Sequence, residues 1–135
     1  MRKPSCFVIW TMFVLGVFLL ANCGNKVERS IKKLASAKKE ERDTAFMELM
    51  LAKGNAIPPL IEALGDEDAW ARWYAAWTLG NIASKVQDEA ALAPAIPPLI
   101  EALQDPDAKV REAAAQALEQ IGTPEAKAAV EAYRE

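Results

Sequence analysis

The nine-residue stretch Ala56-Ile57-Pro58-Pro59-Leu60-Ile61-Glu62-Ala63-Leu64 occurs a second time, letter for letter, as residues 95–103. The copies are 39 residues apart, and the register continues beyond them. The further matching pairs are Asp66 and Asp105, Asp68 and Asp107, Arg72 and Arg111, Ala75 and Ala114, Leu79 and Leu118, and Ile82 and Ile121. Self-similarity at a fixed period of this length is typical of repeat proteins. We therefore expect a chain built from repeated structural units.

A fainter copy of the pattern lies 30 residues upstream of the second one. Its matching pairs are Ile31 and Ile61, Leu34 and Leu64, Ser36 and Asp66, Arg42 and Arg72, Ala45 and Ala75, and Leu49 and Leu79. The difference between the two spacings puts about nine extra residues in the range 84–93, which we expect to lengthen a helix end or form a loop. The predicted units cover residues 27–55, 56–87 and 88–122.

Each unit is predicted to hold two helices. The first is short and has prolines such as Pro58 and Pro59 near its start, where a missing backbone N–H costs little. The turn that follows carries Asp66 or Asp105, which we expect to cap the second helix. In the third unit the second helix has one apolar face, formed by Val110, Ala114, Ala117, Leu118 and Ile121.

Residues 124–135 are predicted to form a capping helix. Gly122, Thr123 and Pro124 stop the helix before it. The apolar side of the final helix is expected to consist of Ala128, Ala129 and Ala132, and its polar remainder suits the end of a solenoid. Because one unit cannot bury its apolar face alone, about three are needed for stability, and the chain has three units and a cap.

Two runs in the third unit, Leu103–Arg111 (LQDPDAKVR) and Ala114–Gly122 (AAQALEQIG), resemble a HEAT repeat of the phycobilisome-lyase HEAT-like type. Residues 56–83 match nearly as well, and residues 27–55 match weakly. The resemblance implies an all-α fold, a short α-solenoid of about three HEAT-like helix pairs plus a C-terminal capping helix, with the second helices on its concave face. It also implies a ladder of charges between repeats, formed by Asp68, Arg72, Asp107 and Arg111; a solvated surface explains these charges equally well.

Residues 1–22 are predicted to be an export signal. Arg2 and Lys3 supply a positive start, and an uncharged, predominantly apolar stretch runs from Phe7 to Ala21. The stretch is about 15 residues long, whereas a helix that crosses a bilayer takes roughly 20. A basic start, a short apolar core and a polar break at Asn22 are typical of a signal peptide. The alternative is an uncleaved membrane anchor.

Residues 20–23, Leu-Ala-Asn-Cys, resemble the lipobox of bacterial lipoproteins, in which cleavage precedes a cysteine that then carries acyl chains. Asn22 stands where that family usually has Gly, Ala or Ser. The resemblance implies lipidation of Cys23, a lipid-anchored tether over residues 23–28 and a repeat domain over residues 27–135. Simple secretion is the alternative to lipidation, besides the uncleaved anchor. Gly24 suggests, by the same resemblance, an outer-membrane destination.

The charge balance argues against nucleic acid as a partner. Removal of Arg2 and Lys3 from the 16 basic residues leaves 14 against 19 acidic residues, a net charge of −5. Phosphate binding needs a basic surface, whereas a peptide, a sugar or another protein remains compatible. If Cys6 leaves with the signal, no disulfide can form, and packing alone must hold the domain together.

Residues that could carry catalysis or hold a metal are scarce. The chain has no histidine, which excludes Ser-His and Cys-His nucleophiles and histidine-containing metal sites. Its six glycines form no phosphate-binding loop. The acidic clusters at residues 66–68 and 105–107 fall at predicted helix starts, where the helix dipole favours acids, and capping explains them better than an acid–base pair or a calcium site. We therefore expect no enzymatic activity, no cofactor and no metal.

Three of the four tryptophans, Trp70, Trp73 and Trp77, lie in one predicted helix. With Tyr74 between them, these residues span an arc of roughly 100°, and the predicted core side is centred roughly 130° away. Their equivalents are Lys109, Glu112 and Gln116 in the third unit and Glu40, Asp43 and Met47 in the first. Because exposed aromatic side chains mark binding sites, we expect a partner-binding surface of Trp70, Trp73, Tyr74, Trp77, Lys109 and Glu112. The alternative is that the rings fold sideways and pack on neighbouring helices.

These features predict a membrane-anchored HEAT-repeat lipoprotein that acts as a non-catalytic scaffold for a protein or peptide. Its expected place is the bacterial cell envelope, on the periplasmic or extracellular side. One alternative is an accessory subunit of an enzyme complex of the bilin-lyase-like type, and a second is a purely structural envelope lipoprotein. No sequence feature specifies the partner or the oligomeric state.

Overall fold

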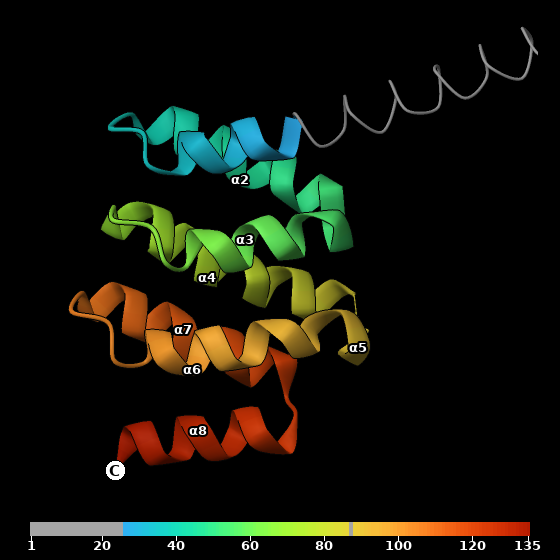
Figure 1. Ribbon diagram of the computed structural model, residues 1–135, viewed down its shortest axis with the longest axis vertical. Helices are drawn as coiled ribbons and strands as arrows, with labels where there is room; N and C mark the ends of the chain where they lie inside the picture. Colours follow the sequence, from blue (N-terminus) through green and yellow to red (C-terminus); the bar gives the residue numbers. More distant parts are fainter. Residues whose placement is uncertain (1–25, 87) are drawn as a thin grey trace, which may run out of the picture.

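The computed structural model describes residues 26–86 and 88–135, and it contains helices and turns but no strand within these two ranges (Figure 1). Residues 26–34 form the first helix. It is followed by α2 (Lys39–Ala52), the 3₁₀ helix η1 (Lys53–Ala56), α3 (Ile57–Ala63), α4 (Ala69–Lys85), α5 (Glu89–Leu92), the 3₁₀ helix η2 (Ala93–Ala95), α6 (Ile96–Ala102), α7 (Ala108–Ile121) and α8 (Pro124–Arg134). The predicted all-α class is confirmed.

The helices form pairs that stack in chain order along the long axis of the molecule (Figure 1). The first pair is helix 26–34 with α2, the second is α3 with α4, and the third is α6 with α7. Helix α4 contacts α2 on one side and α7 on the other, and α8 packs on α7 at the end of the stack. The predicted short α-solenoid of about three helix pairs and a capping helix is therefore confirmed.

Residues 26–28 are helical, and Val27 packs against the core. Residues 27–28 of this turn lie where the predicted tether (residues 23–28) and the predicted repeat domain (residues 27–135) overlap. The predicted export signal and Cys23 lie outside the described residues. Among residues 26–86 and 88–135, no helix combines the length and the hydropathy needed to cross a bilayer.

The second helices α4 and α7 begin at capping aspartates that lie two residues later than predicted, whereas α2 follows Lys38 and has no side-chain cap. Asp68 accepts hydrogen bonds from the backbone N–H groups of Trp70 and Ala71 at 2.8 and 3.1 Å, and Asp107 accepts one from Lys109 at 2.8 Å. The expected caps, Asp66 and Asp105, instead accept from the backbone N–H two residues ahead and close the preceding turn. The prediction is wrong here because both positions carry aspartate, and only backbone geometry separates a turn from a cap.

The extra residues between the second and third units lengthen a helix end, which is one of the two expected outcomes, and form a short helix in place of the expected loop. Helix α4 has 17 residues against 14 for its equivalent α7, so one part of the insertion lengthens a helix end. Another part forms the short helix α5, which leads through η2 into α6.

Helix α8 buries a different side from the one predicted. Ala126 and Val130 are buried and Ala129 is half-buried, whereas Ala128 and Ala132 are exposed. The prediction counted alanines, which occur on both sides of this helix. The larger apolar side chain of Val130 decides which side faces the core, because it has more apolar surface to remove from water.

Helices α4 and α7 approach each other closely at Gly80. A Cβ added to Gly80 would lie 2.9 Å from the Cα of Ala117 and 3.3 Å from its Cβ. Two backbones can come this close only where one of them carries no side chain. Gly80 therefore sets the separation of the second and third units.

We expect Gly80→Ala to lower the free energy of unfolding by about 1–3 kcal/mol, because the added methyl group must push α4 away from α7. Urea denaturation followed by circular dichroism measures the change. Gly54→Ala is the matched control, since a Cβ there meets nothing within 4 Å. Equal stability of the two variants would contradict this account of the α4–α7 contact.

Candidate partner-binding surface

The second helices α2, α4 and α7 bring equivalent positions of the three units into rows. One row is Glu40, Trp70 and Lys109, the next is Asp43, Trp73 and Glu112, the third is Met47, Trp77 and Gln116, and the fourth is Leu51, Asn81 and Gln120. We call the surface formed by these rows the second-helix face. It contains every partner-binding residue that the sequence predicts except Tyr74.

Trp70 is the most exposed of the three tryptophans, with 42% of its surface open to solvent. Two cations from neighbouring units lie over its ring. The guanidinium carbon of Arg42 is 4.7 Å from the ring centroid, and the Nζ of Lys109 is 5.0 Å from it. Contacts of this kind are attractive because the face of an aromatic ring is electron-rich. Trp70 therefore links all three units at the surface.

Trp73 and Trp77 are half-buried and stacked. Their ring centroids are 5.2 Å apart at an interplanar angle of 20°, and Trp77 also stacks on Phe46 of α2 at 4.3 Å and 17°. Trp70 meets Trp73 edge-on at 6.0 Å. The rings thus form a continuous aromatic row that leans from α4 toward α2. The sequence left open the alternative that the rings pack on neighbouring helices. Such packing covers part of the surface of Trp73 and Trp77.

Tyr74 corrects the prediction that placed it on the binding surface. Only 4% of it is exposed, and its hydroxyl donates a hydrogen bond of 2.8 Å to Oδ1 of Asp43. Burial, and then the hydrogen bond to Asp43, raise the pKa of the Tyr74 hydroxyl above its ordinary value, so it remains a donor. The helical arc placed Tyr74 beside the tryptophans, but α2 covers it. Its role is to join α4 to α2.

The ion pair between repeats differs from the predicted one. Arg72 reaches Asp105 of the next unit with two hydrogen bonds, of 2.7 Å from Nε and 3.1 Å from Nη2. Asp68 and Asp107, expected in the ladder, are helix caps instead. Nη1 of Arg111 donates to the carbonyls of Asp105 and Pro106 in its own turn. The prediction named the wrong aspartate, because Asp107 caps α7 and Asp105 is the one that can bind Arg72.

The geometry of this ion pair favours the charged carboxylate. Side-chain exposure is 14% for Arg72 and 8% for Asp105, so solvent screens the pair weakly. Burial raises the pKa of Asp105, but the hydrogen bonds from Arg72 and from the backbone of Asp107 outweigh it, and the pKa lies below its usual value. Asp105 is therefore ionised near neutral pH.

Arg42 occupies the position of Arg72 in the first unit but meets an aromatic ring instead of a carboxylate. It is 7% exposed, and its Nη1 donates to the carbonyl of Ser36. Among the described residues its Nε is buried without a hydrogen-bond partner. Arg42 lies over the rings of Trp70 and Tyr74, at 4.7 and 5.9 Å from their centroids, whereas Arg72 binds the carboxylate of Asp105. The tryptophan thus also covers a buried cation.

Two exposed apolar residues on α2 enlarge the candidate surface beyond the prediction. Met47 is 59% exposed and Leu51 is 78% exposed. They stand one helical turn apart, at the positions of Gln116 and Gln120 in the third unit. The repeat alignment could have identified them. Like the tryptophans, they are apolar at positions where the third unit has a polar residue.

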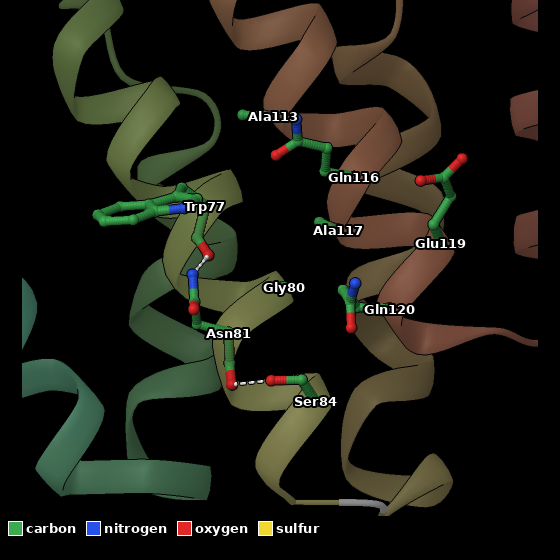
Figure 2. Close-up of a pocket in the computed structure, with 9 residues that line it drawn as sticks. All are labelled: Trp77, Gly80, Asn81, Ser84, Ala113, Gln116, Ala117, Glu119 and Gln120. Atoms are coloured by element: carbon green, nitrogen blue, oxygen red, sulfur yellow. Dashed lines mark hydrogen bonds between the residues drawn. The ribbon is translucent and has the colours of Figure 1, made fainter.

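A polar groove of about 280 Å³ runs along the line where α4 packs on α7, beside the aromatic row. Figure 2 shows Gly80 and Ala117 facing each other, with Asn81 and Ser84 along α4 and Gln116, Glu119 and Gln120 along α7. The ring of Trp77 points away from α7 (Figure 2). Asn81 donates to the carbonyl of Trp77 at 2.8 Å, and Ser84 donates to that of Asn81 at 2.9 Å. The second-helix face is therefore apolar toward α2 and polar toward α7.

The acidic clusters have structural partners. Asp66, Asp68, Asp105 and Asp107 accept backbone N–H groups or the Arg72 guanidinium. Within the described ranges, no group of three or more cysteine, aspartate or glutamate side chains is arranged to hold a metal ion. The chemistry that this surface offers is contact by aromatic, apolar and charged side chains.

Two protein families match parts of the chain. The family described as HEAT repeats matches residues 92–135, and the PBS lyase HEAT-like repeat matches residues 71–105. The two matches overlap and run from α4 through α8. A comparison with curated protein sequences finds no match.

We expect Asp105→Asn to lower the free energy of unfolding at pH 7 by about 1–3 kcal/mol, because Arg72 loses its charged partner. A lowered pKa in the folded state stabilises the fold above the unfolded value of about 3.9, and this contribution disappears as the pH falls through the folded pKa. The difference between the native chain and the variant should therefore shrink toward pH 3.

Urea denaturation at pH 7 and pH 3 measures both effects. Asp66→Asn is the control, since it stands at the same turn position and an asparagine oxygen can still accept the backbone N–H. If the variant at position 105 loses the same amount of stability at both pH values, the ion pair is not the cause.

Proposed function

Because residues 71–135 carry HEAT-like repeats, we propose that the chain is a membrane-anchored helical scaffold, without catalytic activity, that binds a protein or peptide on its second-helix face. The proposal separates into a binding surface, which the described residues support, and a lipid anchor, which the sequence supports.

The observation that carries the binding proposal is the apolar part of the second-helix face. Met47, Leu51 and Trp70 are exposed on two adjacent helices, and the partly exposed Trp73 and Trp77 lie between them. Single exposed apolar residues are ordinary on a protein surface, whereas a contiguous group marks an interaction site. The equivalent positions of α7 are charged or amide side chains, so the repeat fold does not require apolar residues there.

The arrangement of the rings supports a protein or peptide over a sugar. A sugar stacks on an open ring face, but Trp77 stacks on Phe46 and on Trp73, and two cations lie over Trp70. The exposed Met47 and Leu51 beside these rings are aliphatic, and apolar anchors of a protein can contact them. Stacking also holds the rings in place, which reduces the entropy lost when a partner binds. Glu40 and Glu112 are exposed on either side and supply a charged rim.

The membrane anchor rests on the resemblance of Leu20–Cys23 to a lipobox. Residue 26, within a few residues of Cys23, is already helical. A domain with so short a connection would lie close to the lipid surface, on the periplasmic or extracellular side of a bacterial envelope. Its partner would then also have to be near the membrane.

A purely structural lipoprotein is the second candidate. The observation in its favour is the stack of Phe46, Trp77 and Trp73, which gives two tryptophans a packing role without any ligand. It does not account for the exposure of Met47, Leu51 and Trp70. An accessory role in a bilin-lyase-like complex rests on the repeat type alone, which does not establish function.

Photo-crosslinking tests the binding surface. A photoreactive amino acid replaces Leu51, and in a matched control it replaces Tyr133, which is exposed on α8. Irradiation of envelope membranes should join a discrete partner to position 51 but not to position 133. Trp70→Ala should reduce the adduct about tenfold or more, as expected for a tryptophan at the centre of an interface.

Circular dichroism must first show that the Trp70→Ala variant folds. The same adducts from both positions, or an adduct at position 51 that Trp70→Ala leaves unchanged, would count against the surface. The purely structural candidate predicts no discrete adduct at either position.

Metabolic labelling with an alkyne fatty acid tests the anchor. The native chain should take up the label, and Cys23→Ala should abolish it, because the thiol is the acylation site in the lipobox resemblance. Cys6→Ala is the matched control and should remain labelled, since Cys6 lies in the segment predicted to be removed. Label retained after Cys23→Ala would refute lipidation at this residue.

A further inference from the structure

Basic residues are concentrated in the first unit. Residues 26–53 hold 8 of the 14 basic residues that follow the predicted signal and 5 acidic ones, a net charge of +3. Residues 54–135 hold 6 basic and 14 acidic residues, a net charge of −8. Because the units stack in chain order, this split makes one end of the solenoid positive and the rest negative (Figure 1).

Four of these basic residues share one face of the first helix. At about 100° per residue, Lys26, Arg29, Lys32 and Lys33 span an arc of roughly 120°, centred roughly 140° from the buried side of the helix. That buried side is formed by Val27, Ser30, Ile31 and Leu34. Lys26, Arg29 and Lys32 are exposed, and Lys33 is half-buried. We call these four residues the basic face.

The carboxylates of the first unit neutralise only part of the positive charge of the basic face. Nζ of Lys26 lies 4.0 Å from Oε1 of Glu48, but the Lys26 side chain remains 66% exposed, and an exposed pair at this distance binds weakly. The hydrogen bond from Ser30 and the charges of Lys33, Lys26 and Arg29 lower the pKa of Glu48, so this carboxylate offsets one of the four positive charges. Glu28, on the same helix, lies beyond the edge of the basic arc.

We propose that the basic face docks the domain on anionic phospholipid headgroups. Clusters of four or more Lys and Arg next to a membrane anchor are attracted to anionic lipid, and each contributes to the attraction while it lies within a Debye length of the surface. The helix that carries the basic face is the first described segment after the apolar stretch Phe7–Ala21, so a membrane anchor in that region would hold it at the bilayer. This inference rests on the membrane anchor of the proposed function.

Docking by this helix leaves the partner surface free. The basic face belongs to the first helix of its pair, whereas the second-helix face is formed by α2, α4 and α7. The acidic units further along the stack would be repelled by the same lipid surface, since both are negative. The charge split therefore orients the solenoid with its first unit at the membrane and its last unit away from it.

Lysine footprinting on the full, membrane-anchored chain tests this orientation. The chain is reconstituted into nanodiscs of phosphatidylcholine alone and into nanodiscs of an equal mixture with phosphatidylglycerol, and acetylation by an N-hydroxysuccinimide ester is followed by mass spectrometry. Acetylation of Lys26, Lys32 and Lys33 should be about threefold or more slower in the anionic discs. The exposed Lys85 and Lys127 should react equally in both, and high salt should remove the difference.

Charge-reversal variants identify the face. In Arg29→Glu/Lys32→Glu the remaining Lys26 and Lys33 should react at the same rate in both discs. Lys85→Glu/Lys127→Glu changes the net charge equally and should leave their slowing unchanged. Circular dichroism checks that both variants fold.

The outcomes separate the anchor from the docking. A chain that does not enter either disc lacks a membrane anchor, which overturns that part of the proposed function and this inference with it. A chain that enters both discs and shows equal acetylation of Lys26, Lys32 and Lys33 overturns the docking alone, as would a slowing shared by all lysines. The basic face would then bind an acidic macromolecule or be exposed to water without a partner.

Discussion

The packing of α4 on α7, where Gly80 lies against Ala117, is the contact on which the rest of the structure depends. No unit of this size can bury its apolar face alone, so each relies on its neighbours. The small residues leave no room for a large ring between the second and third units. The tryptophans of α4 therefore lie at the surface or lean toward α2, where Phe46 meets Trp77. The close packing of small residues on the α7 side of α4 therefore also explains why the aromatic row lies on the α2 side.

Equivalent arginines show how one residue of the repeat adapts to different neighbours. Arg42, Arg72 and Arg111 each donate from Nη1 to carbonyls of the turn that precedes their own helix. Beyond that shared bond they differ. Arg72 binds the carboxylate of Asp105, whereas Arg42 lies against the face of the Trp70 ring. Because a ring replaces a carboxylate here, the buried Arg42 of the first unit contacts the exposed Trp70 of the second. Trp70 therefore contributes to packing and to the exposed surface.

The molecule divides its surface by chemistry. One end of the stack is basic, the second-helix face is apolar over α2 and α4, and the groove between α4 and α7 is lined by amide and hydroxyl side chains. A repeat fold permits this division because the core positions of each unit are fixed, while the outward positions are free to vary from unit to unit. The differences between units, more than the features they share, are therefore where function is to be sought.

The repeated stretch AIPPLIEAL, its 39-residue spacing and the helical periodicity determined the all-α class, the number of helix pairs and the outward position of Trp70, since these follow from local pattern. Only the tertiary structure decided which aspartate caps a helix and which binds Arg72, because both choices use the same residue type. It also decided that Tyr74 is buried. An arc drawn on one helix describes direction, whereas burial depends on the neighbouring helix that covers it, and that neighbour comes from a distant part of the chain.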